Sequence, residues 1–78
     1  MDLEKVFEIS MENYITWKKC AEEEKDLAKK TKYYKKALFW LETFLIAKEI
    51  ERTDDNKIKE ALAKKLSNYL EEVLKDLS

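Results

Sequence analysis

The chain has 78 residues, of which 42% are charged, and it contains neither glycine nor proline. With 16 basic and 17 acidic residues the net charge is −1, which disfavours nucleic acid as the main partner, because binding to phosphate requires clustered positive charge. The length allows one domain, and the lack of helix breakers together with 45% hydrophobic residues predicts an all-α fold rather than strands or disorder.

The first element in the chain is a long amphipathic helix, which we expect from about residue 2 to 29. Its core-facing residues recur at helical spacing, and they are Leu3, Val6, Phe7, Ser10, Tyr14, Trp17, Ala21 and Ala28. Asp2 is expected to cap the first turn, where its negative charge suits the positive end of the helix dipole. Met11 and Ile15 lie off this face and are expected to be incidental surface residues.

A break in the apolar pattern follows at Lys29-Lys30-Thr31-Lys32. We predict the first turn there, with Thr31 capping the next helix. Because glycine is absent, that turn is expected to be tight or strained. The alternative is one continuous helix from Asp2 to Arg52, which would need an oligomer to cover it.

The second helix, expected from about residue 32 to 52, is apolar around most of its circumference. At about 100° per residue, two apolar groups lie almost opposite each other. One group is Tyr34, Ala37, Leu38, Leu41, Phe44 and Leu45, and the other is Phe39, Ile46 and Ile50 with Thr43 among them. Lys35, Glu42 and Glu49 form the polar strip that remains. A surface helix usually has one apolar stripe, so this helix must be central in a bundle, meet a partner, or do both.

The second turn is predicted at Thr53-Asp54-Asp55-Asn56, since all four residues favour caps and turns. We interpret its acidic residues as a helix cap rather than a calcium loop. The third helix is expected from about residue 55 to 77, with the apolar stripe Ile58, Leu62, Leu66, Tyr69, Leu70, Val73 and Leu77. Short connections make neighbouring helices antiparallel. The prediction for residues 1–78 is therefore a single domain, an antiparallel up-down-up three-helix bundle.

The sequence offers little for catalysis or metal binding. Histidine is absent and Cys20 is the only cysteine, so neither a histidine-activated nucleophile nor a zinc site of the usual ligands can be assembled. We therefore expect a protein that is not an enzyme and uses no cofactor or metal; an enzyme working with carboxylates or tyrosine alone ranks last. The lone cysteine and the absence of a long apolar run favour a cytoplasmic protein without membrane insertion.

Two surfaces are candidates for binding a partner. The positive cluster Lys29, Lys30, Lys32, Lys35 and Lys36, with Tyr33 and Tyr34 interleaved, could contact an anion or RNA, although the preceding acidic run partly cancels its field. The stronger candidate is a groove beside helices two and three that docks a short amphipathic helical peptide. Its expected residues are Phe39, Thr43, Ile46, Ile50, Lys65, Asn68 and Glu72.

Two other interpretations of the apolar arc on helix two stay open. The arc could be ordinary core between the helices of the bundle. It could also form a homodimer through helix two, in a small self-associating structural or assembly protein of viral, plasmid or archaeal type.

The segment Tyr34-x-x-Ala37-Leu38, followed by Leu41 and Leu45, resembles MIT (microtubule-interacting and trafficking) domains, three-helix bundles related in shape to tetratricopeptide repeats. Further matches to the family pattern are Ala21, Asp26, the turn at residues 51–57 and Tyr69-Leu70. Lys32 stands in place of the family's first-turn glycine, and Glu72-Val73 in place of its Arg-Ala. The resemblance implies an adaptor that binds short helical tails of membrane-remodelling filament proteins in grooves beside helix three.

Overall fold

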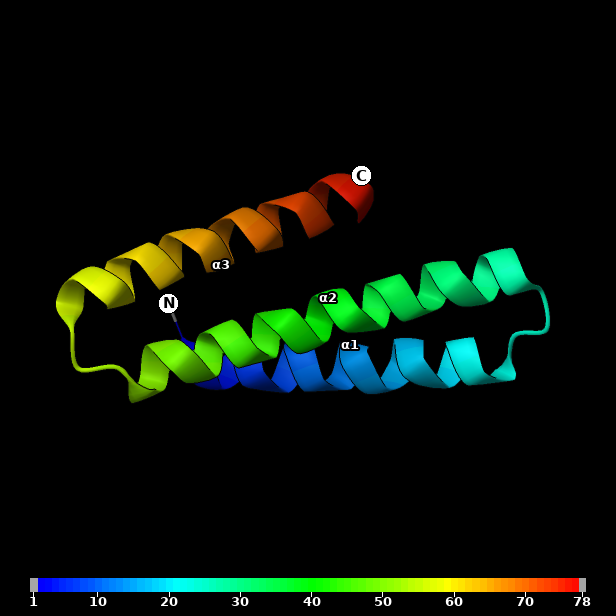
Figure 1. The fold of residues 1–78 in the computed structure, drawn as a ribbon, viewed down its shortest axis with the longest axis horizontal. Helices are drawn as coiled ribbons and strands as arrows, with labels where there is room; N and C mark the ends of the chain where they lie inside the picture. Colours follow the sequence, from blue (N-terminus) through cyan, green and yellow to red (C-terminus); the bar gives the residue numbers. More distant parts are fainter. Residues whose placement is uncertain (1, 78) are drawn as a thin grey trace.

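The computed structural model describes the backbone of residues 2–77 and the side chains of residues 2–72. These residues form three α-helices and no strand: α1 (Leu3–Glu23), α2 (Leu27–Arg52) and α3 (Asn56–Leu77). Figure 1 shows α1 and α3 on different sides of α2, each antiparallel to it, and α2 packs against both. The predicted all-α, up-down-up three-helix fold is therefore confirmed. Val73 and Leu77 of the expected third-helix stripe lie outside the described side chains.

The first turn lies at residues 24–26, so the predicted turn at residues 29–32 and the predicted end of the first helix at Lys29 are wrong. Asp26 caps α2, because its Oδ1 accepts a hydrogen bond of 2.9 Å from the N–H of Ala28. Glu24 Oε1 accepts hydrogen bonds of 3.1 Å from the next two amides. These carboxylates satisfy the amides of the turn, and the lysine-rich run has no acidic side chain to do the same.

Residues 27–32 consequently belong to the start of α2. The hydroxyl of Thr31 donates a hydrogen bond of 2.9 Å to the carbonyl oxygen of Leu27 inside the helix, so Thr31 caps nothing and that prediction is wrong too. The turn also separates α1 from α2, which excludes the alternative of one continuous helix from Asp2 to Arg52.

Both turns are built without glycine and without strain. Glu24, Asp26 and Thr53 have extended backbones, with φ of −81°, −74° and −85°, which any residue adopts. None of the described residues has a positive φ, so the strain expected in the first turn is absent there. The second turn occupies residues 53–55, and Asp55 Oδ1 accepts hydrogen bonds of 2.9 and 3.3 Å from the amides two and three residues later. Asp2 and Asp55 are both helix caps, as predicted.

The core lies along both seams of α2. Its buried residues are Ser10, Ala21, Ala37, Trp40, Thr43, Ala47, Ile50 and Leu66. The α1–α2 seam combines small side chains, which let helices approach closely, with the aromatic pairs Phe7–Phe44 and Trp17–Tyr33, whose centroids are 5.6 and 5.7 Å apart. No described helix is long and apolar enough to cross a membrane.

Candidate functional site

The surface of α2 is divided among three sides with different surroundings. The aromatic pairs place α1 against the side of α2 that carries Tyr33 and Phe44. Phe39 meets α3 through the ring of Tyr69. The third side carries Tyr34, Leu38, Leu41 and Leu45, which we call the outer stripe.

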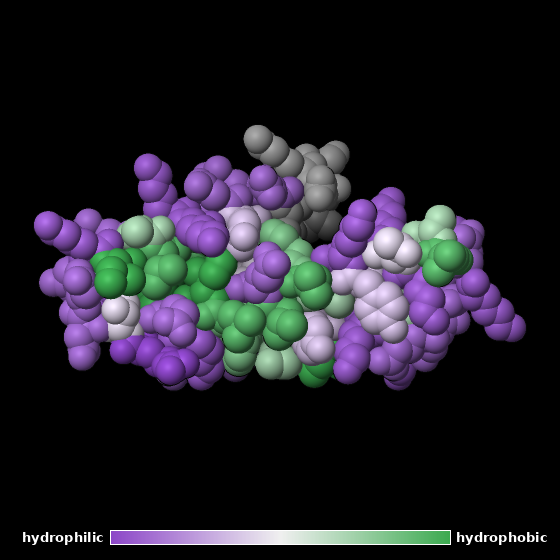
Figure 2. Space-filling model, in the orientation of Figure 1, coloured by the Kyte–Doolittle hydropathy of each residue, from purple (hydrophilic) through white to green (hydrophobic). Residues whose placement is uncertain are grey.

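The outer stripe is an unusually open row of large apolar residues. Tyr34, Leu38 and Leu45 are 42%, 56% and 53% exposed, and Leu41 between them is half-buried. At about 100° per residue, the stripe lies next to the α1 seam and away from the α3 seam. Figure 2 shows apolar side chains in a band that runs from the left end of the molecule to its middle, with hydrophilic residues around it.

Two residues of α1 extend this apolar surface. Phe7 contacts Phe44, and Met11 and Ile15 follow Phe7 at i+4 and i+8, on the same side of α1. Met11 is half-buried and Ile15 is exposed. Both were expected to be incidental surface residues, but the antiparallel pairing of α1 with α2 places them beside the outer stripe.

Charged residues border the outer stripe on both edges, and their sign changes along it. On the edge away from α1 lie Lys35, Glu42 and Glu49, all exposed, so this edge is basic near the start of α2 and acidic toward its end. On the α1 edge, Glu4 and Glu8 lie near one end and Lys18 and Lys19 near the other. The edge away from α1 is therefore acidic around Leu45 and basic around Tyr34. The α1 edge carries both signs at each end, because Lys48 of α2 lies 4.4 Å from the Phe7 ring near Leu45 and exposed Glu22 follows Lys18 by one turn.

The seven residues predicted to bind a partner do not form one open surface. Thr43 is fully buried and Ile50 is 9% exposed, whereas Ile46 packs partly buried against the core cluster. Phe39 is half-buried between two other rings, at 5.4 Å from Trp40 and 5.6 Å from Tyr69. The interpretation of this arc as core therefore describes Thr43 and Ile50, which are buried in the folded chain. Ile50 packs in one cluster with Leu66 of α3.

The three polar members of the predicted groove lie on α3 and are exposed: Lys65, Asn68 and Glu72. The ammonium of Lys65 lies 6.0 Å from the centre of the Tyr69 ring, at the margin of a cation–π contact. These residues border the α2–α3 seam, so peptide docking there stays a prediction.

Sequence reasoning found both apolar groups of α2 but chose the wrong one as the open group. The signal that separates them is the small residues: Ala37 and Ala47 on α2 are buried together with Ser10 and Ala21 on α1. Small residues at a helix contact mark a close seam. The Phe7–Phe44 and Trp17–Tyr33 contacts place α1 beside the group that contains the outer stripe without covering it.

The whole positive cluster lies in the first turns of α2, whereas Lys29 and Lys30 were expected at the end of the first helix and in the turn after it. Lys29, Lys32, Lys35 and Lys36 are exposed, and positive charge near a helix N-terminus is electrostatically unfavourable. The ammonium of Lys36 lies 4.4 Å from the centre of the Trp17 ring, within cation–π range. This contact therefore helps to stabilise the α1–α2 seam.

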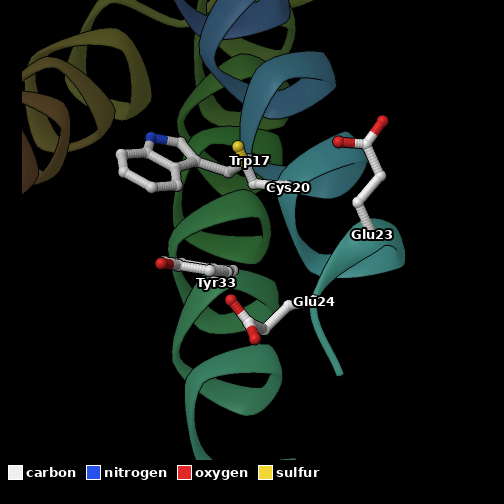
Figure 3. Close-up of a pocket in the computed structure, with 5 residues that line it drawn as sticks. All are labelled: Trp17, Cys20, Glu23, Glu24 and Tyr33. Carbon is white, nitrogen blue, oxygen red and sulfur yellow. The ribbon is translucent and has the colours of Figure 1, made fainter. Parts of the chain in front are cut away.

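A shallow hollow of about 270 Å³ lies at the α1–α2 turn and is lined by Trp17, Cys20, Glu23, Glu24 and Tyr33. Figure 3 shows the Trp17 and Tyr33 rings on one side of the hollow and the Glu23 carboxylate directed away from them. Glu24 is engaged with backbone amides of the turn. Within the described part of the chain, no three histidine, cysteine or acidic side chains are grouped to hold a metal. The hollow therefore brings together no acid–base pair.

No protein-family model, no curated protein and no solved structure matches this chain. The resemblance to MIT domains is consequently carried by the quoted residues alone, and the structure changes how they align. The first turn ends at Asp26, whereas Lys32 and Tyr34 lie inside α2. Lys32 therefore does not occupy the turn position that glycine has in the family.

Proposed function

We propose that the protein is a non-enzymatic interaction module that binds an amphipathic helix on the outer stripe. The observation that carries the proposal is the exposure of Tyr34, Leu38 and Leu45 on a helix whose other two sides are already packed. Single exposed apolar residues are normal on a folded surface, but a contiguous row marks an interaction site.

The spacing of the outer stripe suits a helical partner. Tyr34, Leu38, Leu41 and Leu45 follow one another at intervals of four, three and four residues. This is the spacing with which one helix packs along another, and it is the pattern of helix-in-groove recognition. Met11 and Ile15 on α1 widen the row, so the α1–α2 face offers apolar contacts on two adjacent helices.

The resemblance to MIT domains supports the class of partner rather than the place of binding. What it implies is a short helical segment of another protein held beside the third helix. In this chain Thr43 and Ile50 are buried and Ile50 packs with Leu66 of α3, so we propose binding on the α1–α2 face instead. A non-enzymatic role agrees with the absence of histidine, the commonest general base near neutral pH.

The experiment that tests the proposal maps where a helix binds. The ¹⁵N-labelled protein is titrated with a synthetic amphipathic peptide of about three heptads that has leucine at the a and d positions. We expect amide shifts to change at the outer stripe and around Met11 and Ile15, and we expect Leu38→Glu to abolish them. Lys65→Glu is the matched control and should leave them unchanged. Loss of binding in Lys65→Glu alone would instead place the site beside α3, and no shifts at all would refute the proposal.

A further inference from the structure

We propose that the helix bound on the outer stripe is α2 of a second copy of this chain, packed antiparallel so that two α1–α2 hairpins face each other. Because it names the occupant of the same surface, this inference rests on the proposed function. Charge complementarity along the two edges of the stripe selects both the occupant and its direction.

The outer stripe is self-complementary when two copies are related by a two-fold axis. The centre of the stripe lies between Leu38 and Leu41, so an antiparallel copy brings Leu38 opposite Leu41 of the other copy. The same operation brings Tyr34 opposite Leu45. Each contact occurs twice, as a two-fold interface requires, and the row is apolar along its whole length.

The edge away from α1 shows the charge match most simply. Lys35 and Glu42 are exposed, seven residues apart, and lie on either side of the centre of the stripe. In an antiparallel pair, Lys35 of each copy lies beside Glu42 of the other. In a parallel pair this edge meets the α1 edge instead, which brings Lys35 toward Lys18 and Lys19 and Glu42 toward Glu8. For Lys35 and Glu42, opposite charges therefore meet in the antiparallel arrangement and like charges meet in the parallel one, and such contacts fix register and direction.

The α1 edge also carries opposite charges at its two ends, beside Lys48 at one end and Glu22 at the other. Glu4 lies near the acidic end of the stripe and Lys18 near the basic end, and both are exposed. The two-fold axis that pairs Leu38 with Leu41 passes near Met11 of α1, so Glu4 of each copy lies toward Lys18 of the other. The net charge of −1 leaves little overall repulsion between two copies.

The test measures the mass in solution by sedimentation equilibrium from micromolar to millimolar concentration. We expect a monomer–dimer equilibrium in the unaltered chain. Lys35→Glu and Glu42→Lys should each weaken dimerisation about tenfold, because each substitution places two pairs of like charges together. The double variant exchanges the charges and should restore the dimer. Lys64→Glu and Glu60→Lys make the same charge changes at exposed positions on α3 and should have no effect.

The outcomes separate this inference from the proposed function. A chain that stays monomeric at every concentration, yet shows peptide-induced shifts on the outer stripe, overturns the second copy and leaves the docking surface standing. A dimer that persists in Leu38→Glu, with circular dichroism unchanged, overturns the inference because the contact is then elsewhere. If Leu38→Glu abolishes the dimer but the Lys35→Glu/Glu42→Lys double variant dimerises no better than its two single variants, the antiparallel register is overturned. Failure of both dimerisation and peptide binding overturns both proposals.

Discussion

The ring of Phe39 lies 5.6 Å from the ring of Tyr69, with the two planes inclined by 55°, and this contact joins α2 to α3. Aromatic pairs in this geometry stabilise a seam beyond the area they bury. The contact shows that the Phe39 side of α2 holds the third helix. Of the two apolar groups of α2, the Phe39 group therefore packs against α3. The outer stripe belongs to the other group and stays exposed.

Leu66 is the fully buried side chain of α3 within the described residues. Truncation to alanine should lower the free energy of unfolding by about 2–4 kcal/mol, because it removes buried methyl groups and leaves a cavity. Urea denaturation followed by circular dichroism measures the effect. Ile58→Ala on the same helix is the control, since Ile58 is 49% exposed and should cost far less. Equal losses for the two variants would show that α3 is not packed as described.

The cap of α3 can be tested with two adjacent aspartates. Asp55→Ala should destabilise the protein by about 1 kcal/mol, because Asp55 Oδ1 accepts two amide hydrogen bonds of the first turn. Asp54 has no such hydrogen bond among those described, so Asp54→Ala should change stability little. The shift in the urea midpoint is the readout. A larger effect at Asp54 would contradict the assignment of the cap.

Proline substitutions locate the first turn. Leu27 is the first residue of α2 and follows an extended Asp26, which is where proline is favoured. Leu27→Pro should therefore leave thermal stability nearly unchanged. Lys32→Pro lies inside α2 and should cost about 3 kcal/mol or more. If the turn were at residues 29–32, the two variants would exchange these effects in the melting curves.

Most of the fold could be predicted from this sequence, whereas the position of the open surface could not. Helical periodicity and the acidic caps Asp2 and Asp55 identify three helices and the second turn. The first turn was predicted at the wrong residues because the lysine-rich run at 29–32 interrupts the apolar pattern more visibly than Glu24 and Asp26 do. Those two acidic side chains satisfy the turn amides, a property that depends on local geometry and not on hydrophobic spacing.

The candidate site was missed for a related reason. The outer stripe and Phe39 belong to two apolar groups that look equivalent along the helix. Two features decide which of these groups is covered. They are the direction in which α3 leaves the turn at residues 53–55 and the side of α2 against which α1 packs. Both are long-range packing effects, which periodicity within one helix does not contain.

Ser10 is a buried polar residue whose Oγ has no hydrogen-bond partner among the described residues. Ser10→Ala should raise the free energy of unfolding by about 1 kcal/mol, because it removes an unsatisfied hydroxyl from the α1–α2 seam. Ser67→Ala on exposed α3 is the control that isolates the difference in helix propensity. We expect Ser10→Ala to stabilise more than Ser67→Ala in parallel urea titrations. A destabilised Ser10→Ala variant would mean that the hydroxyl is bonded in solution.

The central claim is that α2 keeps its outer stripe open while its Thr43 side is buried. Single cysteines at positions 43 and 45, in a chain in which Cys20 is replaced by alanine, test it through the rate of labelling by a thiol reagent in dilute solution. We predict fast labelling of Leu45→Cys, which becomes slower as the protein concentration rises, and strong protection of Thr43→Cys at every concentration. Fast labelling at position 43 together with protection at position 45 in dilute solution would contradict the account.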